Sequence, residues 1–169
     1  MSVMDAIKER KSIRKYADKP IENEKLIKVL EAGRLAPSAR NEQNWKFVVV
    51  RDNSLRHNLV DACMGQKFVE EAPVTLVICT NNERNMSCNQ PARTIDCSIA
   101  LSFMMLQASE LGLSTCWLGS FSNDKVKEVL NIPKEYNVVA VTPLGYAAED
   151  VSFRPRKDMK DVVIYDCWQ

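Results

Sequence analysis

The sequence has no apolar run long enough for a membrane helix, and it shows no sign of a secretion signal. A bilayer span needs about 20 consecutive apolar residues, and no stretch of the 169 residues reaches that length. Residues 1–5 lead directly into a helical pattern instead of a signal peptide. We therefore expect a cytoplasmic protein that does not contact a membrane. The length fits a single domain, residues 1–169, with a sizeable core.

Histidine and closely spaced cysteines are also scarce. His57 is the only histidine and lies in a polar helical stretch, which excludes a histidine-based catalytic triad or a multi-histidine metal site. The six cysteines form no C-x-x-C pair, so structural zinc and iron–sulfur clusters are excluded and no metal site is predicted. Several cysteines lie in apolar segments, which predicts buried free thiols in a reducing compartment. Cys88, in contrast, lies in a polar loop.

An excess of charge of one sign is absent as well. The chain has 23 basic and 22 acidic residues, so nothing attracts it as a whole to nucleic acid or to an anionic surface. Because the charges balance, any cluster of basic residues is a local feature. The sequence also lacks the glycine fingerprint of a resident dinucleotide.

One such cluster occupies residues 10–16, directly after an amphipathic helix. It combines Arg10, Lys11, Arg14 and Lys15 with the hydroxyl of Ser12. Guanidinium groups present a planar fork of donors to phosphate oxygens, and the serine adds a short, stiff donor. The segment therefore favours an anion site. The alternative is a solvated basic face at a helix end.

A second segment, residues 36–47, is a polar loop that leads into the apolar run 48–50. Ser38, Asn41 and Gln43 can each donate and accept hydrogen bonds, as the edge of a heteroaromatic ring requires. The alternative is an ordinary helix-to-strand turn, in which Pro37 stops the helix and Asn41 takes a left-handed backbone.

The hydrophobic pattern alternates between helices and strands, without repeats or linkers. The predicted strands consist mostly of apolar residues. Such strands are covered on both faces, which predicts helices above and below one sheet. The helix at 94–111 is apolar nearly all round, so it is either the central helix of a monomer or is covered by a second subunit. The predicted helices are 2–9, from a cap at Asn23 to Pro37, 53–64, 94–111 and 123–130, and the predicted strands are 47–50, 74–80, 115–119 and 138–142.

Together these segments resemble the FMN-dependent nitroreductase superfamily. The resemblance covers nearly the whole chain, with its blocks in the family's order. The blocks are residues 10–14, the spaced pattern 36–45, the helix with Asp96 followed by 112–119, Pro143-Leu144-Gly145-Tyr146, and 154–157. The resemblance implies an α+β fold with a central mixed sheet, helices on both faces and an intertwined homodimer with FMN at the subunit junction.

The resemblance also implies roles for individual residues. Arg10 and Ser12, joined by Arg154 and Arg156, would hold the phosphate or ribityl chain, and Arg14 would lie near the pyrimidine edge. A backbone N–H near a turn at Pro143, Leu144 and Gly145 would reach the flavin N5, unless this is a plain strand-ending turn. The remaining implied cofactor contacts are Lys11, Gln66 with Lys67 beside it, and Pro37, Ser38, Ala39, Asn41 and Gln43 from the partner subunit.

The activity implied by the resemblance is a ping-pong oxidoreduction. NADH or NADPH would give hydride to the flavin, and an electron-poor acceptor such as a nitroaromatic or quinone would then take it, without a catalytic side chain. The other possibilities are reductive dehalogenation, flavin fragmentation, or a non-enzymatic FMN carrier or redox sensor.

The sequence departs from the family pattern at two positions of the polar loop. Arg40 stands where relatives commonly have glycine, and Asn44 stands where they have proline. Arg40 would either crowd the site or supply a charge for an acidic substrate or for the phosphate of NADPH. The chain also lacks the long insertions that form substrate lids, which predicts an open site. The apolar tail at 162–165 would pack on the partner or add a strand to it.

Overall fold

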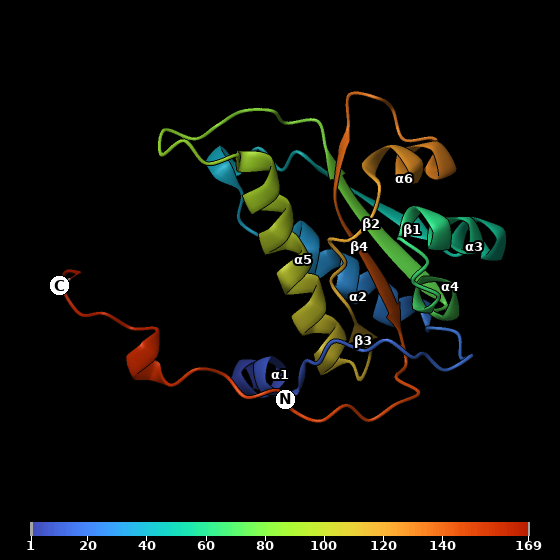
Figure 1. Ribbon diagram of the computed structural model, residues 1–169, viewed down its shortest axis with the longest axis horizontal. Helices are drawn as coiled ribbons and strands as arrows, with labels where there is room; N and C mark the ends of the chain where they lie inside the picture. Colours follow the sequence, from blue (N-terminus) through green and yellow to red (C-terminus); the bar gives the residue numbers. More distant parts are fainter. Residues whose placement is uncertain (1, 169) are drawn as a thin grey trace.

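A four-stranded sheet lies at the centre of the protein, as the computed structural model shows for residues 2–168 (Figure 1). The strands lie in the order β1-β2-β4-β3, and each neighbouring pair is antiparallel. The prediction of a mixed sheet is therefore wrong for these strands, because an apolar run indicates burial but not direction. Within residues 2–168, parallel pairing is confined to an isolated bridge between Ser12 and Thr115. The strands are β1 Trp45–Val50, β2 Val74–Thr80, β3 Ser114–Thr115 and β4 Asn137–Gly145.

The helices begin and end close to the predicted positions. Ser2 caps the first helix, with its hydroxyl accepting from the backbone of Asp5 at 3.2 Å and its own N–H donating to the Asp5 carboxylate at 2.9 Å. The predicted cap at Asn23 is wrong, because Glu22 takes that position and Asn23 begins the helix. The helices are α1 Val3–Glu9, α2 Asn23–Arg34, α3 Asn53–Ala62, α4 Phe68–Glu71, α5 Ala92–Glu110 and α6 Asn123–Leu130, with short 3-10 turns at Ala39–Asn41 and Met159–Asp161.

Helices cover both faces of the sheet, as the apolar strands predict. The fully buried strand β2 directs Leu76 and Ile78 into a core shared with α2 and α5. Its alternate residues Val77 and Cys79 join the core on the other face, which α3 and α6 cover. Strand β2 is therefore the centre of two apolar layers. None of the helices described is long and apolar enough to cross a membrane.

Helix α5 is the longest helix and packs against α1, α2 and the sheet (Figure 1). Its close approach to α2 depends on Gly33, because a Cβ there would lie 2.1 Å from Cε of Met104. Phe103, in contrast, points away from this core and is 41% exposed. The expectation that α5 is apolar on more than one face is confirmed.

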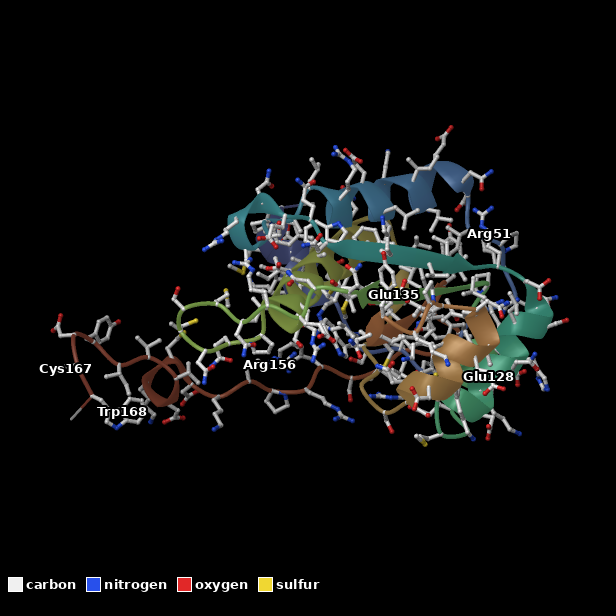
Figure 2. All side chains as sticks on the ribbon, turned by 90° about the horizontal axis from the view of Figure 1, so that it is seen from above. Arg51, Glu128, Glu135, Arg156, Cys167 and Trp168 are labelled. Carbon is white, nitrogen blue, oxygen red and sulfur yellow. The ribbon has the colours of Figure 1, made fainter. Side chains whose placement is uncertain are left out.

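The chain after β4 forms an extended tail. It first runs beside the segment after α1, where Ala17 donates to Tyr146 O and Ala148 donates to Lys15 O, each at 2.9 Å. It then leaves the body of the protein, so that Trp168 lies at the far end of the tail (Figure 2). Val162, Ile164, Tyr165 and Trp168 are exposed there.

Candidate functional site

The basic segments from the two ends of the sequence meet at one cavity. Its volume is about 100 Å³, and it is lined by Arg10, Lys11, Ser12 and Arg14 from one segment and by Val151, Ser152, Phe153, Arg154 and Arg156 from the tail. We call this cavity the basic cradle. The structure therefore brings together six of the residues predicted to bind the cofactor.

Backbone pairing holds the first segment of the basic cradle in place. Helix α1 ends at Glu9, and Arg10 turns the chain into an extended path. Ile13 then donates to Thr115 O at 3.1 Å, beside the bridge from Ser12 to Thr115. The buried hydroxyl of Tyr16 donates to Ile13 O at 2.9 Å. The edge of the sheet thus fixes the course of the segment.

The basic cradle carries more positive than negative charge. Four arginines and one lysine line it. Among the described residues, the one salt bridge to these cations joins Lys11 to Asp150 at 3.2 Å, and the Asp150 side chain is almost fully exposed. Arg156 donates to Arg154 O at 2.8 Å and lies over the ring of Phe153. Forked cations around a small space suit a dianion such as a phosphate.

The charge of the basic cradle also reaches a buried thiol. Burial raises the pKa of Cys116, while the positive charges of Arg14 and Arg10 and a hydrogen bond with Ser12 act in the opposite direction. Cys116 is only 2% exposed, so the thiol lies inside the protein and not on its surface. The cations therefore act on the interior at the end of β3.

A second cavity, of about 280 Å³, adjoins the basic cradle and shares Arg10, Lys11 and Val151 with it. Its walls are partly apolar, with Ile13, Met105 and Leu113, and partly polar. The polar lining residues include the hydroxyl residues Ser109, Ser114 and Thr115 and the acidic residues Glu9, Glu149 and Asp150. The phosphate-sized space therefore lies beside a larger one at the C-terminal end of α5.

The polar loop at residues 38–43, which we call the 38–43 loop, lies at the other end of α5 (Figure 1). The backbone N–H of Ala39 donates to the carboxylate of Asp96 at 3.0 Å. Helix α5 has 19 residues and is therefore about 28 Å long. Within one chain, the structure does not bring this loop to the basic cradle.

The 38–43 loop has an unusual backbone. Arg40, Asn41 and Gln43 have φ values of 54°, 57° and 52°, in the left-handed region that costs a residue other than glycine about 1–2 kcal/mol. The Gln43 N–H donates to Ser38 Oγ at 3.0 Å, and the Gln43 side chain donates to Asn41 O at 3.1 Å. Ser38, Asn41 and Gln43, which are predicted to contact a heteroaromatic ring, thus also stabilise the conformation of the loop. Pro37 follows the end of α2, as expected.

Sequence reasoning missed a second anchor of this loop. Glu42 forms a salt bridge with Arg84 at 3.0 Å and accepts from the Asn82 side chain at 3.3 Å. The partners lie about 40 positions apart in the sequence, so no local pattern signalled the pair. The sequence analysis included Asp96 in the pattern of the resemblance but assigned it no role.

The turn predicted at Pro143, Leu144 and Gly145 is wrong. These residues lie inside β4, all buried, and pair with β2 and β3, because the apolar run of β4 continues through the proline. A Cβ on Gly145 would lie 2.7 Å from Cδ of Pro73 and 3.1 Å from the ring of Tyr16. Glycine is therefore required there for packing. The predicted contact with the flavin stays a prediction.

The other predicted contact, Gln66, lies just before α4. Its side-chain amide donates to Cys63 O at 2.8 Å and to Ser120 O at 3.0 Å. It therefore links the end of α3 to the loop before α6. Nearby, Gly119 faces open space, because a Cβ there would meet nothing within 4 Å.

The isolated residues behave largely as expected. His57 is a surface residue, with its side chain 74% exposed and its Nδ1 2.6 Å from Glu70. Cys63, Cys79, Cys97 and Cys116 are buried and unpaired, which confirms the prediction of buried free thiols. Cys88 and Cys167 are free and exposed.

Comparisons with known proteins agree with this architecture. A sequence model described as "Nitroreductase family" matches residues 7–70 and 62–146. An NADH dehydrogenase of Thermus thermophilus is 30% identical over an alignment of 188 positions, which covers 92% of each chain. An FMN-dependent nitroreductase from Clostridium difficile R20291 superposes with a TM-score of 0.84 at 34% identity, over 96% of this chain and 99% of that one. The NADPH:FMN oxidoreductase of Vibrio harveyi, solved with NAD+, gives 0.90 at 25% identity, over 99% and 78%. The chain belongs to the nitroreductase family.

Proposed function

We propose that this protein is an FMN-dependent oxidoreductase that takes hydride from NADH or NADPH and delivers it to an electron-poor small molecule, a nitroaromatic or a quinone, in a ping-pong cycle. The observation that carries the proposal is the convergence of Arg10, Arg154 and Arg156 on one phosphate-sized cavity. The names of the relatives, which include FMN-dependent and NADPH:FMN enzymes, support the same cofactor and donor. When bound, FMN supplies the hydride chemistry.

The residues of the basic cradle bind and orient in this proposal. Arg10, Arg154 and Arg156 hold the phosphate through charge-assisted hydrogen bonds, and Ser12 adds a hydroxyl donor. Arg14 places a positive charge at the ring edge, which favours the uptake of electrons. The adjoining cavity beside Met105 and Leu113 gives the rest of the cofactor a partly apolar wall. No side chain acts as a nucleophile.

We also propose that the working unit is an intertwined homodimer. The 38–43 loop and the basic cradle lie at opposite ends of α5, so both meet one flavin only if the loop comes from a second copy. An apolar groove of about 500 Å³ between α1, α2 and α5, lined by Val3, Ala32 and Phe103, is open in the single chain. The apolar tail is exposed too, with Trp168 86% exposed. A second copy would cover both surfaces.

The free buried thiols fit a reducing compartment, so we place the protein in the cytoplasm.

Among the described residues, no cluster of three or more histidine, cysteine or acidic side chains could hold a metal ion.

The absorbance spectrum of the purified protein tests the cofactor, and anaerobic reduction with NADH and with NADPH tests the donor. We expect bound FMN that is bleached by at least one nicotinamide and reoxidised by a nitroaromatic or quinone. A colourless protein that does not bind added FMN would contradict the proposal. Binding without turnover would indicate a carrier or sensor instead. Turnover only with a halogenated acceptor, or loss of the flavin with oxygen, would indicate dehalogenation or fragmentation.

A further inference from the structure

Two acidic side chains, one outside the 38–43 loop and one within it, hold the loop in place. On one side, the carboxylate of Asp96 in α5 accepts the Ala39 N–H at 3.0 Å. On the other side, Glu42 within the loop pairs with Arg84 at 3.0 Å. These two contacts join the loop to α5 and to the segment between β2 and α5.

The anchors are themselves fixed to regular elements. The Arg84 N–H donates to the Asn82 side chain at 2.9 Å, and the Asn82 N–H donates to Thr80 at the end of β2 at 3.1 Å. The Ala92 N–H, at the start of α5, donates to Arg84 O at 3.1 Å. Arg84 is therefore tied to a strand and a helix before it meets Glu42.

Two features show that this arrangement has an energetic cost. The loop holds Arg40, Asn41 and Gln43 in left-handed backbone, which persists only where the surroundings over-determine it. Asp96 is 5% exposed, and its Oδ2 has no hydrogen-bond partner among the described residues. A buried acceptor without a partner lowers stability.

We infer that Asp96 and the Glu42–Arg84 pair are positioning residues that form the 38–43 loop before the flavin arrives. The inference rests on the proposed function, which makes the isoalloxazine ring the ligand of this loop. A loop that is already ordered loses little conformational entropy on binding, so the affinity for the ring is higher. Without the anchors, the left-handed residues relax and the loop must be ordered by the cofactor.

Dilution of the purified protein, followed by flavin fluorescence, gives the FMN dissociation constant for each variant. We expect Asp96→Ala and Glu42→Ala to raise it about tenfold or more. Asp96→Asn keeps a side-chain oxygen for the Ala39 N–H and should stay within about threefold of the wild type. The matched control is Glu83→Ala, which removes a neighbouring pair with Arg93 at 3.7 Å that does not touch the loop, and it should change nothing.

Amide hydrogen exchange in the flavin-free protein gives a readout that needs no cofactor. The amides of Ala39 and Gln43 should be protected in the wild type and should exchange about tenfold faster in Asp96→Ala and Glu42→Ala, while the urea midpoint of Glu42→Ala is unchanged. If Asp96→Ala does not fold, Glu42→Ala and Asp96→Asn decide the question.

Unchanged exchange and unchanged FMN affinity in Glu42→Ala and Asp96→Ala would overturn the inference, even if stability fell. Equal losses in Asp96→Asn and Asp96→Ala would overturn the role of the hydrogen bond to Ala39. If the wild type binds no FMN, the proposed function fails, whereas the exchange measurement still decides whether the anchors order the loop.

Discussion

Arg10 and Arg156 line the same cavity, although they lie near opposite ends of the chain. Arg10 is the C-cap residue of helix α1, and Arg156 lies on the tail after β4 (Figure 2). The pairing of Ala17 with Tyr146 and of Ala148 with Lys15 aligns the two segments. The fold thus makes one cationic site from two distant basic runs.

Removal of Arg156 should weaken FMN binding. Hydrogen bonds to charged groups contribute about 1.5–3 kcal/mol, so Arg156→Ala should raise the FMN dissociation constant about 10- to 100-fold. The measurement is fluorescence titration at two salt concentrations, with a smaller salt dependence in the variant. Lys157→Ala is the matched control, because Lys157 does not line the cavity. Equal affinities of Arg156→Ala and the wild type would exclude the phosphate role.

The proposed dimer should dissociate when a charge is placed in the apolar groove. Phe103→Glu would bury a carboxylate against a second copy, which is unfavourable without a partner. Light scattering should give twice the 19.2 kDa chain mass for the wild type and a single chain for the variant. Leu55→Glu on α3, outside the groove, should leave the dimer intact. If the Phe103→Glu protein is still a dimer, the interface lies elsewhere on the protein.

Arg40→Gly should stabilise the protein by about 0.5–1 kcal/mol, because glycine takes the left-handed backbone at Arg40 without the steric cost of a Cβ. Urea unfolding measures this effect. Arg40→Ala removes the charge and keeps that cost, so it separates charge from strain. The ratio of kcat/KM for NADPH and NADH in both variants tests whether Arg40 meets the NADPH phosphate, and an unchanged ratio excludes it.

Gly145→Ala should destabilise the protein by about 1–3 kcal/mol, because the new methyl group would overlap the ring of Pro73. Gly119→Ala, where the space is open, should stay within about 0.5 kcal/mol of the wild type. Urea unfolding compares the two variants, and equal stabilities would contradict the packing at Gly145.

Stability should fall at alkaline pH. Burial raises the pKa of Cys97 from 9.0 to about 12 and that of Cys63 from 9.0 to about 11. The folded state therefore favours the neutral thiols. Their contribution is complete below pH 9 and is lost as the pH rises towards the folded values, by the order of 1 kcal/mol per pH unit for each thiol. Urea unfolding at pH 8, 9 and 10 should show a smaller decline for Cys97→Ala. An identical decline would exclude Cys97 as a cause.

Much of the fold was predictable because its signals are local. The apolar run of β2 and the capping box at Ser2 lie within a few residues, so pattern alone located them. The strand direction and the continuation of β4 through Pro143 were not predictable, because they depend on neighbours in the sheet. The short helix α4 was missed, since four residues give no helical period.

The sequence by itself determined the chemical groups of the site: forked cations at both ends of the chain, and a loop of amides and hydroxyls between them. Only the tertiary structure decided that the cations share one cavity, that α5 separates them from the 38–43 loop, and that Asp96 and Arg84 hold this loop. The reason is physical. Side-chain chemistry is encoded residue by residue, whereas proximity depends on how strands and helices bury their apolar faces against one another.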